Sequence, residues 1–342
     1  MHWVLQENLF DEQGFRDALD VLERFNIPYS LHKVVPFVGD LQPDISPDDN
    51  VICMGSYSMR HIAKKKGWYP GVFDLEPVNF NEQMKHWGPY MLNADAVVSR
   101  FADAKIVTGK AFLRPIEDSK VFAGRVFTDQ ELTEWQHSII TMGDDYGSSM
   151  NGDTLIQVCP VKEIYAEYRY WIVDDKIVTK SMYKRGDVVH YSSDVDHRFD
   201  RFVTSLTGGN FYLSYWRPHD AYVIDVCDTP DGIKVVELNT LNSAGFYAAN
   251  MTDLIMALEE KFSRKEPRKI IDGDTLGFKC QVERDAGFYY CPHNPFAPPV
   301  EKSPEPEPPT QEMIAMWIDG VRNNDPQKEA YIELLKKLPM FG

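Results

Sequence analysis

The chain has 342 residues, of which 43% are apolar and 26% are charged, a composition typical of a soluble globular protein of about two domains. Its formal net charge of −16 argues against non-specific binding to nucleic acid or to an anionic membrane, because both would repel it. No apolar run reaches the roughly 18 residues of a membrane helix, and the N-terminus lacks the basic start of a signal peptide. Since the five cysteines are scattered and mostly lie in apolar runs, we expect reduced thiols and a cytoplasmic protein.

Residues 1–100 alternate between short apolar runs and amphipathic stretches. The runs "HWVLQ", "SLHKVV" and "NVICMG" predict strands. The stretch "DEQGFRDALDVLERFNIP" predicts a helix that ends before Pro28, and "SYSMRHIAKKKG" predicts a short helix closed by Gly67. This alternation indicates a small open α/β domain.

Residues 101–265 are richer in strands and predict an α+β domain built mostly from antiparallel pairs. Asp174 and Asp175 separate "YRYWIV" from "KIVTKSMY", which is a two-residue hairpin signal. "YVIDVCD" and "IKVVELN" flank "TPDG", in which Pro230 and Gly232 suit a tight turn. The stretches "DQELTEWQHSII" and "AANMTDLIMALEEKF" predict helices that cover these sheets.

The composition changes after residue 265. Residues 266–295 predict an extension packed as a flap, residues 296–310 a linker rich in Pro and Glu, and residues 311–342 a helical tail. Cys280, Cys291 and His293 resemble part of a zinc site. Without a C-x-x-C pair or a clear fourth ligand, we favour a two-stranded flap over zinc.

The second hairpin carries the strongest candidate site. Asp225 lies on its first strand, and Glu237 and Asn239 lie on its second, with Glu237 12 residues beyond Asp225 around the turn. An antiparallel pair would bring these oxygens together on one face, which suits Mg²⁺ with phosphate ligands. The alternative is a solvated hairpin edge with incidental acids.

Basic residues precede and accompany that hairpin. Arg114 and Lys120 bracket a loop in "AFLRPIEDSKVFAG", where they would clamp a polyphosphate or simply be solvated. In "AEYRYW", Glu167 and Arg169 share a strand face, as a structural ion pair or as an arginine directed at phosphate. Lys184 extends this local basic surface despite the acidic whole.

Taken in order, "FLRPIEDSKVFAG", "AEYRYWIVDDKIV" and "YVIDVCDTPDGIKVVELNTLNSAGFY" resemble the ATP-grasp superfamily. The chain is most similar to a divergent clade related to the eukaryotic cell-division-cycle factor that helps assemble a translation initiation factor. The resemblance implies an ATP-grasp fold over residues 101–265, with two α+β lobes that sandwich the nucleotide. Residues 1–100 would be the pre-ATP-grasp domain.

The resemblance also implies roles for individual residues. Asp225, Glu237 and Asn239 would hold Mg²⁺. Arg114, Lys120 and Arg169 would be catalytic groups that contact phosphate, with Arg169 oriented by Glu167. The nucleotide contacts implied in this way are Arg114, Lys120, Val158, Val161, Glu163, Glu167, Arg169 and Lys184. The familiar glycine-rich phosphate loop is missing between Arg114 and Gly124.

The activity implied by the resemblance is ATP- and Mg²⁺-dependent ligation of a carboxylate to an amine through an acylphosphate. The carboxylate and amine are undetermined, with a peptide or protein among the candidates. A non-catalytic ATP-binding assembly or chaperone factor is the alternative. Neither reading involves a membrane, and the charge disfavours a nucleic-acid partner.

Overall fold

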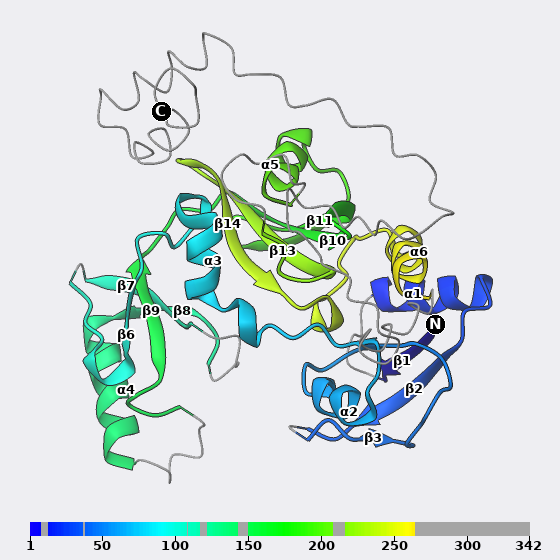
Figure 1. The fold of residues 1–342 in the computed structure, drawn as a ribbon. Coiled ribbons are helices and arrows are strands. Elements are labelled where there is room, and N and C mark those ends of the chain that lie inside the picture. Colours follow the sequence, from blue (N-terminus) through cyan, green and yellow to red (C-terminus); the bar gives the residue numbers. More distant parts are fainter. Residues whose placement is uncertain are drawn as a thin grey trace, which may run out of the picture. The chain divides into compact units, whose positions relative to one another are not determined.

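The structure is a computed structural model that describes residues 1–7, 13–36, 38–107, 109–116, 122–142, 150–207 and 216–263 (Figure 1). These residues all fall within one compact unit that spans residues 1–265. Lys120 and the predicted flap, linker and tail of residues 266–342 lie outside the described residues, as do Cys280, Cys291 and His293. No helix in the described part is long and apolar enough to cross a membrane.

The first sheet confirms the α/β pattern predicted for the N-terminal region. Its strands lie in the order β3-β2-β1-β4-β5, and all pairs are parallel except β2 with β3. The strands are β1 His2–Gln6, β2 Tyr29–Val34, β3 Leu41–Gln42, β4 Val51–Met54 and β5 Pro70–Gly71. The helices are α1 Gln13–Arg24 and α2 Met59–Lys66, and α2 ends at Gly67, whose φ of 66° suits glycine.

The second sheet is antiparallel, with the strand order β6-β9-β7-β8. Its strands are β6 Val97–Arg100, β7 Lys110–Pro115, β8 Arg125–Thr128 and β9 Leu155–Pro160. Helix α4, Asp129–Met142, packs against it as predicted, because Leu132 and Ile139 join the buried cluster and Trp135 stacks on Phe127.

The third sheet contains both predicted hairpins, and its five antiparallel strands lie in the order β12-β11-β10-β13-β14. The strands are β10 Ala166–Val173, β11 Lys176–Arg185, β12 Val188–Ser192, β13 Ala221–Thr229 and β14 Gly232–Asn239. Asp174 and Asp175 turn the first hairpin with φ of 52° and 63°. The two antiparallel sheets and their helices confirm the predicted α+β class.

Two helices cover one face of the third sheet. Tyr168, Tyr170 and Ile172 of β10 share a buried cluster with Phe199 of α5, His197–Thr207, and with Phe80 of α3, Phe80–Trp87. Neither helix was predicted. Short 3-10 helices span Glu76–Val78, Gly88–Tyr90, Phe101–Asp103 and Leu241–Ser243.

The other face of the third sheet packs on helix α6, Met251–Phe262, which lies between this sheet and α1 in Figure 1. Trp171 and Val223 supply apolar contacts there. One end of the same face is polar, because alternation along β10 brings Arg169 and Glu167 to the side that Trp171 occupies. The fold thus leaves charged groups at the end of a buried sheet face.

A buried asparagine ties the end of β14 to the first sheet. The Asn242 amide donates to the carbonyls of Cys53 (2.6 Å) and Gly71 (3.1 Å), and its Oδ1 accepts from the Phe73 amide (2.8 Å) and the Thr240 hydroxyl (3.0 Å). With every polar atom of the side chain used, this contact fixes the segment that follows Glu237 and Asn239.

Candidate functional site

The candidate site begins with a register shift in the second hairpin. From the turn, Thr229 pairs with Gly232 and Val226 with Val235, but Asp225 pairs with Glu237. Val236 is therefore the extra residue of a β-bulge. A regular ladder would place Val236 opposite Asp225; the bulge instead brings Glu237 there, so both carboxylates share one sheet face.

Asp225 forms a bidentate ion pair with Arg169, which lies directly opposite it on β10. Nε and Nη2 of the guanidinium donate to the two carboxylate oxygens at 2.8 and 2.7 Å, and Nη1 donates to the carbonyl of Gly245 at 3.3 Å. Both side chains are buried, Asp225 with 1% and Arg169 with 7% of its surface exposed. Burial raises the pKa of Asp225 to about 6, against the pull of Arg169.

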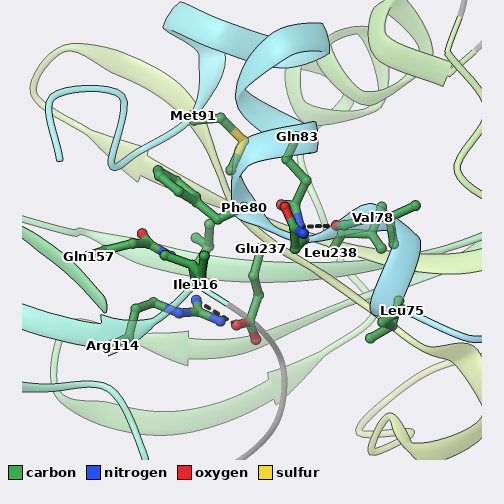
Figure 2. A pocket seen from close by; sticks show the side chains of 12 residues that line it. Leu75, Val78, Phe80, Gln83, Met91, Arg114, Ile116, Gln157, Glu237 and Leu238 are labelled. Carbon is green, nitrogen blue, oxygen red and sulfur yellow. Dashed lines mark hydrogen bonds and ion pairs between the residues drawn. The ribbon is translucent and has the colours of Figure 1, made fainter. Parts of the chain in front are cut away.

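Glu237 has its own arginine, contributed by another sheet. Nη1 of Arg114, on β7, lies 2.8 Å from Oε2 of Glu237, and Figure 2 shows the two groups facing each other at the edge of a small cavity. Asn239 links the two acids, because its Nδ2 donates to Glu237 (2.9 Å) and Asp225 (3.1 Å). Burial alone would raise the pKa of Glu237, but the charge of Arg114 and the bond from Asn239 hold it below its usual value.

Glu167 pairs with Lys184 rather than with Arg169, so the predicted orientation of Arg169 by Glu167 is wrong. Lys184 lies 2.9 Å from Glu167, and the Tyr183 hydroxyl donates to the same carboxylate at 2.8 Å. Tyr183 is the extra residue of a second bulge, since Glu167 pairs with Lys184 but Tyr168 with Met182. Residues two apart on a strand are farther from each other than cross-strand neighbours, which explains the choice of partners.

Three tyrosines cover this polar end, and sequence reasoning missed their role. The ring of Tyr247 lies 5.1 Å from that of Tyr183 and 5.0 Å from that of Tyr191. The Arg169 guanidinium carbon lies 4.9 Å from the Tyr247 ring and 5.5 Å from the Tyr183 ring. The sequence signal was weak, because Tyr247 lies in the irregular segment that follows β14 and Tyr183 occupies a bulge.

The remaining predicted residues lie apart from these pairs. Val161 and Glu163 line a second cavity of about 330 Å³ together with Asp231 and Lys234 near the β13–β14 turn. The cavity beside Arg114 and Glu237 is only about 20 Å³. Val158 lies within β9 and packs against the cluster of the second sheet. The structure therefore groups the arginines and acids of the site with Asn239 and Lys184, and separates Val158, Val161 and Glu163 from them.

The donor set fits a hard cation in residue type. Asp225, Glu237 and Asn239 offer carboxylate and amide oxygens within hydrogen-bond distance of one another, as Mg²⁺ prefers. No group of three or more His, Cys, Asp or Glu side chains in the described segments is arranged to hold a metal ion. Two protein carboxylates with an amide, phosphate and water would suit Mg²⁺, which keeps several such ligands.

Comparisons with solved structures give distant similarities. They include D-cycloserine synthetase DcsG (9% identity, TM-score 0.49, 76% of this chain and 99% of that one). An ATP-grasp RimK domain protein of Sphaerobacter thermophilus has 11% identity and a TM-score of 0.47 over 77% and 96%. D-alanine–D-alanine ligase of Bacillus anthracis also has 11% identity and a TM-score of 0.47, over 76% and 96%. No curated protein matches the sequence.

A family model gives the decisive comparison. The model describes an ATP-grasp domain, the third family of one clade of that superfamily, and it matches residues 51–258. The match spans more than half of the chain and covers the strands that supply Arg114, Arg169, Asp225 and Glu237. The chain therefore belongs to the ATP-grasp superfamily, in the clade family that this model describes.

Proposed function

We propose that this protein is an ATP- and Mg²⁺-dependent carboxylate–amine ligase. The observation that carries the proposal is the meeting of two carboxylates, an amide and two guanidiniums across β7, β10, β13 and β14 in a chain of the ATP-grasp family. Groups of this kind bind a metal–polyphosphate and neutralise charge that develops during phosphoryl transfer.

The nucleotide phosphates would contact Arg114 and Arg169, with Lys120 proposed as a further contact. Glu167 and Lys184 would bind the nucleotide next to Arg169. Val158, Val161 and Glu163 remain proposed contacts of the adenosine part. Asp225, Glu237 and Asn239 would hold Mg²⁺, which when bound supplies positive charge to the phosphate oxygens.

The proposed reaction needs no nucleophile from the protein. A substrate carboxylate attacks the γ-phosphorus of ATP, the bond to the β-γ bridging oxygen breaks, and ADP leaves. An amine then attacks the acyl carbon of the acylphosphate, releases phosphate and loses a proton to form the amide. Arg114 and Arg169 would orient the phosphoryl group and offset its charge, so catalysis rests on positioning and electrostatics. A peptide or protein is among the candidate substrates.

A non-catalytic ATP-binding assembly factor is the second candidate. The resemblance to the eukaryotic cell-division-cycle factor suggests it, and the burial of the Arg169–Asp225 pair favours it, because buried bidentate pairs also serve purely structural roles. Both candidates require the nucleotide, and only the ligase requires turnover.

The test combines binding with turnover. ATP with Mg²⁺ should raise the melting temperature of the wild-type protein, since a ligand that binds only the folded state stabilises it. ADP release should then require a carboxylate and an amine from a panel of amino acids and peptides. Glu237→Gln should abolish that release while the protein stays folded. Stabilisation by Mg²⁺–ATP without turnover on any substrate would instead support the assembly factor, and no stabilisation would reject both.

A further inference from the structure

Each acidic side chain of the candidate site already contacts a cation of the same site. Arg169 lies 2.7 Å from Asp225, Arg114 lies 2.8 Å from Glu237, and Lys184 lies 2.9 Å from Glu167. Three carboxylates face three basic groups, so the described part of the site is electrically balanced without any ligand. The partners proposed for phosphate and for metal are therefore occupied by each other.

Burial makes this balance consequential. The side chains of the Arg169–Asp225 pair are only 9% and 1% exposed, so water does little to screen either charge. A cation that approached Asp225 with Arg169 in place would meet a fixed positive charge on both carboxylate oxygens. A phosphate that drew Arg169 away would leave a buried carboxylate with no cation, which is strongly unfavourable.

The Arg114–Glu237 pair repeats the arrangement at a more open position, with side chains 22% and 28% exposed. Asn239 donates to both acids through the same Nδ2 and couples the two pairs. Either ligand alone would therefore leave charges of the opposite sign without partners. Metal and polyphosphate together would supply a partner for every group.

We propose that Arg169 and Arg114 act as internal counter-ions that hold Asp225 and Glu237 in the ligand-free protein, so that metal and nucleotide bind only as a unit. This inference rests on the proposed function, because it assumes that the site binds Mg²⁺–ATP. The carboxylates exchange arginine for metal, and the arginines exchange carboxylate for phosphate. Mg²⁺ and ATP must then raise each other's affinity by the same factor.

The test measures each ligand alone. Mn²⁺ binding to the nucleotide-free protein, followed by electron paramagnetic resonance, should be weak in the wild type and about tenfold tighter in Arg114→Gln and Arg169→Gln. ATP binding in EDTA, followed by calorimetry, should be about tenfold tighter in Glu237→Gln and Asp225→Asn, because each frees an arginine. The two sets of variants thus improve opposite ligands, which a loss of folding cannot produce.

The Arg198–Asp228 ion pair provides matched controls. Asp228 lies three residues beyond Asp225 on β13, so it points to the opposite sheet face, where Arg198 of α5 contacts it. Arg198→Gln and Asp228→Asn remove the same kinds of charge and should change either affinity less than about twofold. If Arg169→Gln does not fold, the more exposed Arg114→Gln carries the metal test.

The outcomes separate this inference from the proposed function. A wild type that binds Mg²⁺–ATP, with Arg114→Gln showing unchanged or weaker Mn²⁺ binding, would overturn the counter-ion role and leave the function intact. The same holds if wild-type protein binds Mn²⁺ or metal-free ATP as tightly as it binds them together. Failure of the wild type to bind Mg²⁺–ATP would reject the function and with it the inference.

Discussion

Tyr247 holds its ring 4.9 Å from the guanidinium carbon of Arg169, and it does so from a left-handed backbone conformation with φ of 52°. A bulky residue rarely adopts that conformation, and the strain persists only where the surroundings impose it. The stacked Tyr183 ring and the carbonyl of Gly245 surround the same guanidinium. The segment after β14 therefore returns over the sheet and encloses the Arg169–Asp225 pair.

Replacement of the Tyr247 ring should weaken this enclosure. Tyr247→Leu should lower the free energy of unfolding by about 1–2 kcal/mol more than Tyr247→Phe, because only phenylalanine keeps the cation–π contact with Arg169. Urea denaturation measures the difference. Tyr165→Leu, at a tyrosine 47% exposed, is the control. Equal losses in the two Tyr247 variants would show that the ring face contributes nothing.

Asn242→Ala should destabilise the protein by about 3 kcal/mol or more. The change removes both donors to Cys53 and Gly71 and leaves the Phe73 amide without its acceptor, all in a buried position. Asn242→Asp should be at least as severe, because a buried carboxylate would face two carbonyls. Chemical denaturation tests this, and a loss within about 0.5 kcal/mol would contradict the proposed tie.

Asn250 should stabilise helix α6 by capping its N-terminus. Its side chain accepts hydrogen bonds from the amides of Thr252 (3.0 Å) and Asp253 (3.3 Å). Asn250→Ala should cost about 1 kcal/mol, whereas Asn250→Asp and Asn250→Ser should be close to neutral because they keep an acceptor. Thermal and urea denaturation of the three variants would check the order, and an alanine variant as stable as the aspartate one would contradict the cap.

Stability should fall in mild acid because of His219. Burial lowers the pKa of this histidine, against the opposing influence of the Asp74 carbonyl that it contacts and of the nearby Asp74 and Asp220 charges. The unfolded chain therefore binds the proton at higher pH than the folded one. The contribution is complete above about pH 6.5 and is lost as the pH falls below that value, at up to about 1.4 kcal/mol per pH unit.

His219→Gln should flatten that dependence. Urea unfolding between about pH 7 and pH 5 measures the slope for the wild type and the variant. The pKa of His2 is also lowered, by burial and by His32, so some slope should remain in the variant. Equal slopes in the two proteins would show that His219 is not the group that titrates.

The patterns that repeat locally were predictable. Alternating apolar residues predicted the strands of both hairpins, and the pair Asp174–Asp175 predicted the turn between β10 and β11. The helix closed by Gly67 and the α/β order of the first sheet also followed from local signals. Helices α3 and α5 were not predicted, and both are short and stabilised by burial against the third sheet.

The amino-acid sequence determined which chemical groups this protein has at the ends of its strands, since hairpin turns and alternation place Asp225, Glu237 and Asn239 near one another. Only the tertiary structure decided which cation each acid contacts. Two bulges, at Val236 and Tyr183, changed the register at the polar end and set Glu237 beside Asp225 and Lys184 beside Glu167. Arg114 reaches Glu237 from a separate sheet. Partner choice depends on distances across strands and between sheets, and residue spacing along the chain does not encode those distances.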